Sequence, residues 1–384
     1  MAQHLTVADL VHTLDDFAPT WLAEDWDNVG LLLGSPADAL TGPVLITIDL
    51  TEAVLEEAFA SKASAVIAYH PPIFKPIKRL IDDSALSRTL LRAARAGLAI
   101  YSPHTALDAT RDGMTDWLAN KLLLSRQSGS PHSADRRALR PAPSLPPSQR
   151  LKIVTFVPVD AVERVRLGLA SAGAGMIGEY SVCSFAAEGT GTFFGSEKSS
   201  PAVGSPGQLE SVREMRLEMV CARRALPIAL QTLKQFHPYE HPAIDVYELQ
   251  PQPRRDTGLG RRLILDTPQD LDTIAQRLKT NLNIPVVTVA QAKPGKIKTI
   301  GVCPGAGGDL APLALSDGCE LFITGEMKHH EVLAMTAAGL SILLCGHTAT
   351  ERGYLPTFAQ QLSTRLPSAK FIVSAADADP LRAV

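Results

Sequence analysis

The first 124 residues alternate between amphipathic segments and short segments that are apolar throughout. Apolar side chains at helical spacing, such as Leu10, Leu14 and Phe17, indicate helices, and the apolar runs indicate strands. The pattern predicts helices at residues 6–17, 51–61, 84–96 and 113–124, and strands at 43–49, 65–69 and 98–101. Because these strands show no polar alternation, we expect a parallel sheet with helices on both faces.

Residues 125–150 break this pattern. These 26 positions hold six Ser, five Pro and five Arg, and their large apolar side chains are Leu139 and Leu145. A segment of this composition buries too little apolar surface to offset the entropy of ordering its chain. We therefore expect a disordered linker over residues 125–150, which ends a first domain at residues 1–124.

Two further regions follow the expected linker. Residues 151–250 predict a small α+β domain, with strands at 151–157, 213–220 and 244–249, helices at 159–172 and 226–236, and a hairpin from 180–185 and 190–194. Residues 251–384 return to α/β alternation, with helices at 268–282, 326–338 and 347–366, and strands at 286–290, 297–303, 320–324, 341–345 and 370–374. We expect residues 1–124 and 251–384 to form one α/β unit, or two packed halves, with residues 151–250 inserted.

Composition and charge narrow the classes of function. The 384 residues are 45% apolar and 20% charged with a net charge of −3, so the chain has the composition of a globular protein and no basic surplus for nucleic acid. The five cysteines form no CxxC pair, which favours reduced thiols over a disulfide framework. We find no signal-peptide pattern and no apolar run approaching about 18 residues, and therefore expect a soluble, cytoplasmic protein.

Three segments that follow predicted strands carry metal-ligand chemistry. They contribute His70 after the strand at 65–69, His104 and Asp108 after the strand at 98–101, and His347 and Glu351 after the strand at 341–345. Within each pair a spacing of four places both side chains on one face of a helical turn. Taken singly, His70 before a proline is more often an ordinary loop residue. A loop histidine or a carboxylate at a helix start explains each of the other two segments about as well as a metal site does.

The three segments gain significance together, because each lies at the carboxyl end of a strand, the usual binding edge of an open α/β sheet. Imidazole and carboxylate ligands suit zinc, iron, manganese or cobalt, and a set rich in both fits water activation better than a closed structural site. We expect all five residues to bind metal. Glu351, Asp108 and His104 are also the residues that we expect to act in catalysis.

Weaker signals elsewhere have ordinary structural explanations. The loop at 303–309 could cradle a phosphate, although a tight turn explains it better. His330 fits either a substrate contact or a helix start. The run at 237–241 resembles a ligand set, but residues of an edge strand around prolines explain it better. The run at 25–30 could line a cleft, or form a turn with a buried Trp26.

At these motifs the chain resembles a known family, the NIF-three-like dinuclear-metal proteins, also called type-two GTP cyclohydrolase homologues. The matching stretches are residues 26–30, 69–74, 101–108, 256–261, 324–330 and 347–352. Residues 173–180 and 237–240 look like the inserted domain of longer members. The resemblance implies a three-layer α/β/α fold with an inserted ferredoxin-like domain of the PII signalling type.

The resemblance also implies a toroidal homohexamer with two divalent metal ions per subunit, drawn from zinc, iron and manganese. It carries the family's ligands onto His70, Asp108, His347 and Glu351, with His104 close by. One departure is Tyr69, which stands beside His70 where many bacterial members have a second histidine. This Tyr-His form resembles the eukaryote-type branch and weakens the case for a fully occupied second metal position.

The leading functional hypothesis from the sequence is a metal-dependent hydrolase in which activated water attacks an electrophilic carbon, as in opening the purine ring of GTP. The expected partner is then a small molecule such as a nucleotide, with no membrane and no nucleic acid. The substrate rests on the family label alone. The alternative hypothesis is a non-catalytic protein that binds or delivers metal, or regulates a partner.

Overall fold

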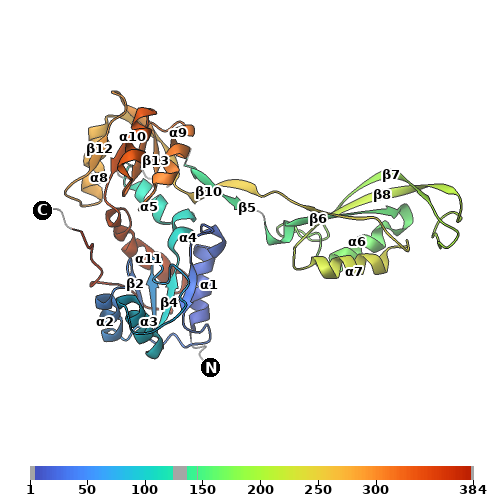
Figure 1. Ribbon diagram of the computed structural model, residues 1–384, viewed down its shortest axis with the longest axis horizontal. Coiled ribbons are helices and arrows are strands. Elements are labelled where there is room, and N and C mark those ends of the chain that lie inside the picture. Colours follow the sequence, from blue (N-terminus) through green and yellow to red (C-terminus); the bar gives the residue numbers. More distant parts are fainter. Residues whose placement is uncertain (1–4, 124–135, 145, 382–384) are drawn as a thin grey trace. The chain divides into compact units, whose positions relative to one another are not determined.

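The computed structural model describes residues 5–123, 136–144 and 146–381. The chain forms two compact units, one made of residues 1–142 and 254–384 and the other of residues 143–253. Both units are drawn in Figure 1.

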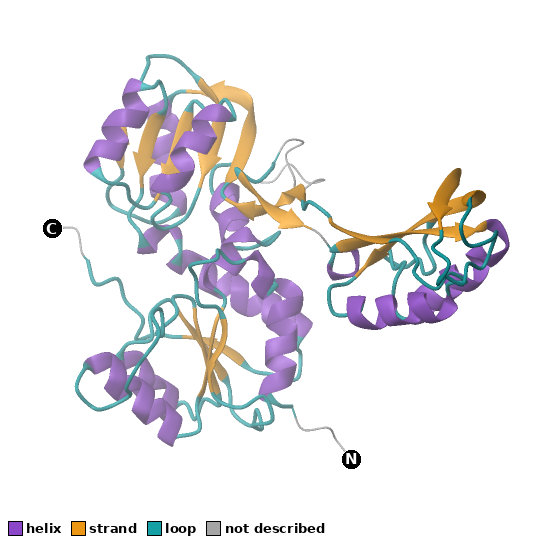
Figure 2. Cartoon of the chain, turned by 45° about the vertical axis from the view of Figure 1, so that its right-hand side comes forward, coloured by secondary structure: helices purple, strands orange, loops and turns teal. Residues whose placement is uncertain are grey.

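The first unit contains two open sheets, each between two layers of helices (Figure 2). The first sheet has the order β1-β4-β3-β2-β16, with the four strands from β4 to β16 parallel and β1 antiparallel at the edge. Its strands are β1 (Gly30–Leu33), β2 (Val44–Thr47), β3 (Ala65–Ala68), β4 (Ala99–Ser102) and β16 (Phe371–Val373). Helices α1 (Val7–Phe17) and α11 (Leu355–Arg365) pack on one face, and α2 (Glu52–Ala60) and α3 (Ala85–Arg95) on the other.

The second sheet has the order β11-β13-β14-β15-β12, with β13, β14 and β15 parallel. Its strands are β11 (Arg261–Gln269), β12 (Thr288–Ala290), β13 (Ile297–Val302), β14 (Leu321–Thr324) and β15 (Ser341–Leu344). Helices α5 (Met114–Asn120) and α8 (Leu271–Asn281) pack on one face, and α9 (Ala311–Ser316) and α10 (His329–Ala337) on the other. The expected parallel sheets covered on both faces are therefore confirmed, as is the three-layer fold.

The two ends of the chain are interleaved in this unit. Strand β16, near the carboxyl terminus, pairs with β2 in the first sheet, while α5 from the first 142 residues covers the second. Arg261, which is 2% exposed, donates to Asp116 at 3.0 Å and to the carbonyl of Thr110 at 2.9 Å. It thereby ties β11 to the turn after α4 (His104–Ala109), which carries two of the candidate site residues.

The expected disordered linker is wrong for its described residues. Strand β5 (Arg140–Ser144) pairs with β10 (Gln252–Leu259), and Ala138 and Leu139 are buried. Leu139 packs beside Cys303 and Leu310, so backbone pairing and a small apolar contact order a segment that composition alone marked as disordered. Residues 125–135 and 145 of that expected linker lie outside the described residues.

Three local predictions are also wrong. The helix expected from Pro268 begins only at Leu271, because β11 continues antiparallel to β13 as far as Gln269. The hairpin expected within residues 180–194 is instead the single strand β7 (Phe185–Phe194), which pairs with β8 (Leu209–Cys221). The long helix expected from His347 is two short turns, Thr348–Thr350 and Arg352–Tyr354, followed by α11 from Leu355. Other 3-10 turns are Thr20–Leu22, Pro147–Gln149, Val159–Ala161 and Gly308–Leu310.

The second unit has the chain order of a ferredoxin-like fold, strand–helix–strand–strand–helix–strand. Besides β7 and β8 it contains β6 (Leu151–Pro158), α6 (Val162–Ser171), α7 (Leu226–Phe236) and β9 (Ile244–Glu248). The antiparallel sheet has the order β7-β8-β6-β9, and both helices pack on one of its faces. Among the described residues of both units, no helix is long and apolar enough to cross a membrane.

Candidate metal centre

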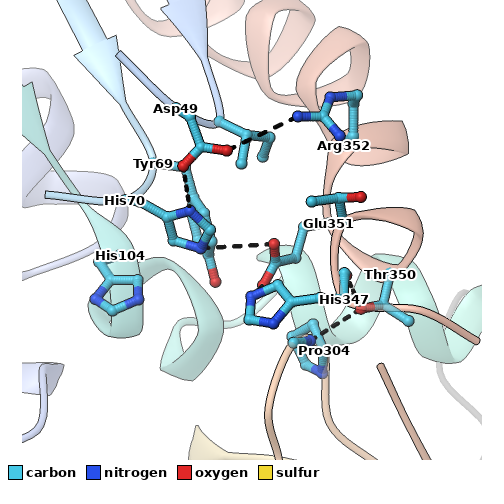
Figure 3. A network of polar contacts seen from close by, with 12 residues as sticks. Asp49, Tyr69, His70, His104, Pro304, His347, Thr350, Glu351 and Arg352 are labelled. Carbon is cyan, nitrogen blue, oxygen red and sulfur yellow. Dashed lines mark hydrogen bonds and ion pairs between the residues drawn. The ribbon is translucent and has the colours of Figure 1, made fainter. Parts of the chain in front are cut away.

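Three side chains from distant parts of the sequence converge in the first unit. His70 follows β3, while His347 and Glu351 flank the turn that follows β15. His347 Nε2 lies 3.2 Å from Glu351 Oε1, and His70 Nε2 lies 3.6 Å from Glu351 Oε2. One ligand atom from each residue lies within 4.8 Å of the other two. Figure 3 shows the three side chains turned toward one another, as a shared cation would require.

The Nδ1 atom of each of these two imidazoles forms a hydrogen bond with a carboxylate other than that of Glu351. His70 Nδ1 donates to Asp49 Oδ1 at 2.9 Å, and His347 Nδ1 donates to Glu326 Oε1 at 3.0 Å. A carboxylate on one ring nitrogen fixes the tautomer and leaves the other nitrogen free to bind a metal. The Nε2 atoms that face Glu351 are therefore presented as ligands.

His104 has the same kind of support but a different position. Its Nδ1 donates to Asp27 Oδ1 at 2.8 Å, and its ring centroid lies 5.5 Å from that of His70. Its backbone has a φ of 25°, in the left-handed region that is strained for a residue with a side chain. Asp27 also accepts hydrogen bonds from the amide and hydroxyl of Thr105, which hold this strained start of α4 in place.

Asp108 is buried one helical turn further along α4, as the spacing of four predicted. Its Oδ1 accepts a hydrogen bond from the Tyr69 hydroxyl at 2.8 Å. Burial, and secondarily the charge of Glu351, raise the pKa of Asp108 to about 7, although the charge of His104 opposes the rise. Among the described residues, the tight group of candidate ligands contains His70, His347 and Glu351 but neither His104 nor Asp108.

The electrostatics of the group favour positive charge. Burial alone would lower the pKa of His70, but the carboxylates of Asp49 and Glu351 raise it to about 10. Glu351, with Glu326, raises the pKa of His347 to about 9 against the effect of burial. Burial would raise the pKa of Glu351, yet the two histidines lower it. Without a metal, two imidazolium groups therefore neutralise the buried carboxylate, and a cation that binds must replace their protons.

Two further features fit a bound metal ion. Glu351 is 2% exposed, and its Oε2 is buried without a hydrogen-bond donor among the described residues. A Cβ added to Gly305 would lie 2.5 Å from Glu351 Oε1 and 3.3 Å from His347 Nε2, so glycine keeps space open beside both ligand atoms. Two imidazoles and one carboxylate match the three protein ligands of catalytic zinc sites.

The weaker sequence candidates have structural explanations. In the loop at 303–309 the amide of Gly305 donates to the Thr350 hydroxyl and the amide of Gly307 donates to the Thr324 hydroxyl. Because these amides already have partners, the loop is a tight turn rather than a phosphate-binding loop. His237 is buried and lies 3.0 Å from the carbonyl oxygen of Phe156. His330 is exposed at the start of α10.

Sequence reasoning missed the supporting carboxylates. Asp49 and Glu326 each stand two residues beyond the end of a strand, β2 and β14. The rule that selected His70 and His347, position at the carboxyl end of a strand, would have selected both. Asp27 lies in the loop before β1, a strand that the sequence pattern did not predict. Its run at 25–30 was interpreted as a cleft lining or as a turn with a buried Trp26, but Trp26 is 58% exposed.

Comparisons with known proteins extend over nearly the whole chain. A family model described as Duf34/NIF3 (NGG1p interacting factor 3) matches residues 5–380. The NIF3-like protein 1 of Rattus norvegicus is 32% identical over 384 residues, which cover 98% of this chain and 92% of the rat protein. The GTP cyclohydrolase 1 type 2 homolog of Bacillus subtilis is 31% identical and covers 91% of this chain and 90% of its own length.

Solved structures agree with the sequence comparisons. A Bacillus cereus protein related to NIF3 is 30% identical with a TM-score of 0.67, and the alignment covers 100% of both chains. Staphylococcus aureus protein SA1388 is 26% identical with a TM-score of 0.80, again over 100% of both chains. The likeness therefore includes both units of the chain described above.

Proposed function

The chain belongs to the Duf34/NIF3 family, and from that premise we propose that it is a metal-dependent hydrolase with a dinuclear metal site. The observation that carries the proposal is the convergence of His70, His347 and Glu351, with each imidazole held by its own carboxylate. A histidine with a purely structural role does not need one carboxylate at Nδ1 and another near Nε2. A metal ligand commonly has both.

Different residues would bind the first ion and orient its ligands. His70, His347 and Glu351 hold the first ion, and Asp49 and Glu326 orient the two imidazoles. A divalent cation of the zinc, iron or manganese type, when bound, lowers the pKa of a coordinated water toward about 7 and supplies a nucleophile at neutral pH.

His104 and Asp108 stand beside this group and are the residues that would hold a second ion. The carboxylate of Asp108 is buried, and the Tyr69 hydroxyl orients it by a hydrogen bond. Where the second ion is absent, Asp108 would instead take up and return a proton, because a buried carboxylate beside Glu351 holds a proton more readily than an exposed one.

The substrate class follows from the names of relatives. The Bacillus subtilis relative is called a GTP cyclohydrolase 1 type 2 homolog, so a nucleotide with an electrophilic ring carbon is the substrate that we propose. One water opens the ring and leaves its carbon as a formamide, and a second water hydrolyses that formamide to formate and an amino-nucleotide. A cytoplasmic location and a ring-shaped homohexamer belong to the same proposal, and native mass spectrometry would measure the number of subunits.

The test is formate release from GTP by purified protein loaded with manganese or zinc. We expect release by the unchanged chain and none by His347→Ala, which removes a ligand of the first ion. His12→Ala is the matched control, because His12 is an exposed histidine on α1 with Asp16 as its ion-pair partner. If the protein loaded with either ion releases no formate, the proposed cyclohydrolase activity is wrong.

A second candidate function is metal binding without turnover. The observation that favours it is the hydrogen bond from Tyr69 to Asp108, which occupies an oxygen that a second ion would use. If His347→Ala loses bound metal while neither protein turns over any nucleotide, this alternative replaces the hydrolase.

A further inference from the structure

The second unit contains a cavity of about 910 Å³ whose lining shares no residue with the metal centre. It is bounded by the β7–β8 hairpin, by the loop at 195–202 between these strands, and by the segment at 239–243 before β9. Figure 1 shows the long hairpin extending from the sheet of this unit. A volume near the upper end of the range for small-molecule sites, about 300–1,000 Å³, makes this a candidate ligand site.

A buried carboxylate lies in this cavity. Glu214 on β8 is 7% exposed, although it lies on the sheet face opposite to the α6 and α7 core, to which its neighbours Met215 and Leu217 belong. Across the hairpin it pairs in register with Gly189. A Cβ at the next glycine on that face, Gly191, would lie 2.1 Å from Glu214 Oε2. Glycine at 191 therefore makes room for the carboxylate to lie flat along β7.

Among the described residues, no lysine, arginine or histidine forms an ion pair with Glu214 within 4.0 Å. The two arginines on either side of it in sequence are engaged elsewhere. Arg213 donates to Glu188 at 2.6 Å, and Arg216 donates to Glu218 at 2.7 Å. Burial raises the pKa of Tyr239, and the negative charge of the nearby Glu214 adds to the rise. The Tyr239 hydroxyl has no hydrogen-bond partner among the described residues.

A buried carboxylate without a cation is costly, because little water remains to solvate its charge. A ligand that brought a positive charge would remove this cost. The other charged side chains that line the cavity are also acidic on balance. Glu188 and Glu240 are acidic, Arg216 is basic but paired, and His241 is exposed beside Glu240 at 3.8 Å.

Aromatic rings stand beside this carboxylate. Phe193 and Tyr239 line the cavity with their ring centroids 6.4 Å apart and their planes tilted by 60°. Phe156 also lines it, and the Arg216 guanidinium already lies 5.8 Å from that ring centroid. The faces of aromatic rings attract cations and pack against apolar groups.

We propose that this cavity binds a small organic cation, with its ammonium group against Glu214 and its apolar body against the cavity-facing surfaces of Phe193 and Tyr239. The chemical class is a protonated amine on a flat or apolar body. An anion would meet an acidic wall, and a bare metal ion would find one buried carboxylate where it needs several ligands. The site is independent of the metal centre, so the proposal does not depend on the proposed hydrolase activity.

The probe for this site is benzylamine, a cation with one ring, and benzyl alcohol is its uncharged counterpart of the same shape. Both are titrated into the full-length protein and followed by saturation-transfer difference NMR. We expect saturable binding of benzylamine and at least tenfold weaker binding of benzyl alcohol. Glu214→Gln, which keeps the shape and removes the charge, should weaken benzylamine binding at least tenfold.

The matched control is Glu163→Gln, because Glu163 is an exposed glutamate of α6 that is paired with Arg166 and does not line the cavity. Its affinity for benzylamine should stay within twofold of the unchanged chain. A second variant, Gly191→Ala, keeps the charge but displaces the carboxylate, and it should also weaken benzylamine binding. Hydrogen exchange of the β8 amides shows that each variant is folded.

Three results would overturn the proposal: no saturable binding of benzylamine, equal affinity for benzyl alcohol, or unchanged affinity in folded Glu214→Gln. The first would also be the result if a second copy of the chain filled the cavity.

Discussion

Glu351 and Glu214 are both buried glutamates, with 2% and 7% of their surfaces exposed, yet their surroundings differ completely. Glu351 faces two imidazoles that come from separate strands, and other carboxylates hold both. Glu214 faces aromatic rings and has no cationic partner among the described residues. Glu351 is part of a polar network in which a metal ion can replace the protons of His70 and His347. Glu214 is compensated only by a ligand that brings its own charge.

The largest effect that separates the two sites is the pH dependence of metal binding. With pKa values raised to about 10 and about 9, His70 and His347 are protonated in the metal-free protein between pH 6 and 8. A metal must displace both protons, so its affinity should fall up to about one hundredfold for each unit by which pH is lowered. Competition with a chelator of known proton affinity at pH 6, 7 and 8 measures the slope. A slope near zero would mean that neither imidazole is a ligand.

Removal of the central charge should have the next largest effect. Glu351→Gln keeps the shape of the side chain but removes a ligand charge, and we expect metal affinity to fall by a factor on the order of one hundred. Glu56→Gln is the control, because Glu56 is an exposed glutamate of α2 paired with Arg92. Isothermal titration with zinc measures both. Equal affinities in the two variants would contradict the assignment of Glu351.

The supporting carboxylates sharpen the comparison within the metal centre. Asp49→Asn should weaken binding of the first ion by about tenfold or more, because the imidazole of His70 loses the group that orients it. Asp27→Asn should leave the first ion unaffected and reduce the number of ions per chain only where His104 helps to hold a second. Metal analysis by mass spectrometry gives that number. Loss of the first ion in Asp27→Asn would place His104 in the tight group.

The smallest effect is on stability, and here the two glutamates should differ in sign. In the metal-free protein at pH 7, Glu351→Gln should lower the free energy of unfolding of the first unit by about 2 kcal/mol, because charged contacts to two imidazoles are lost. Glu214→Gln should raise that of the second unit by about 1 kcal/mol, because an uncompensated charge is removed.

The units can be followed separately in the same denaturant titration. Tryptophan fluorescence reports on the first unit, which contains Trp21, Trp26 and Trp117, and hydrogen exchange of β8 reports on the second. A loss of stability on Glu214→Gln as large as that on Glu351→Gln would mean that Glu214 already has a partner.

The same comparison explains how far the sequence could predict the molecule. His347 and Glu351 were recognisable because metal-ligand residue types follow an apolar strand at a spacing of four. The layers were recognisable because buried parallel strands are apolar throughout. Glu214 carried no signal, since an isolated glutamate on an alternating strand predicts an exposed side chain. Its burial depends on the glycines of β7 and on a loop that folds back over the sheet.

Other features depended on contacts that the sequence does not display. Strand β5 was mistaken for a linker because its partner β10 lies more than 100 residues away. The tight group contains three of the five expected ligands. Asp108 lies outside it, where the Tyr69 hydroxyl donates to its carboxylate, and His104 lies outside it although Asp27 supports its ring as Asp49 supports that of His70.

The most direct test of the metal centre is an anomalous difference map from a crystal of the zinc-loaded protein, measured at the zinc absorption edge. We expect a peak in contact with His70 Nε2, His347 Nε2 and the carboxylate of Glu351. A map with zinc elsewhere in the protein, and none between these three side chains, would contradict the account.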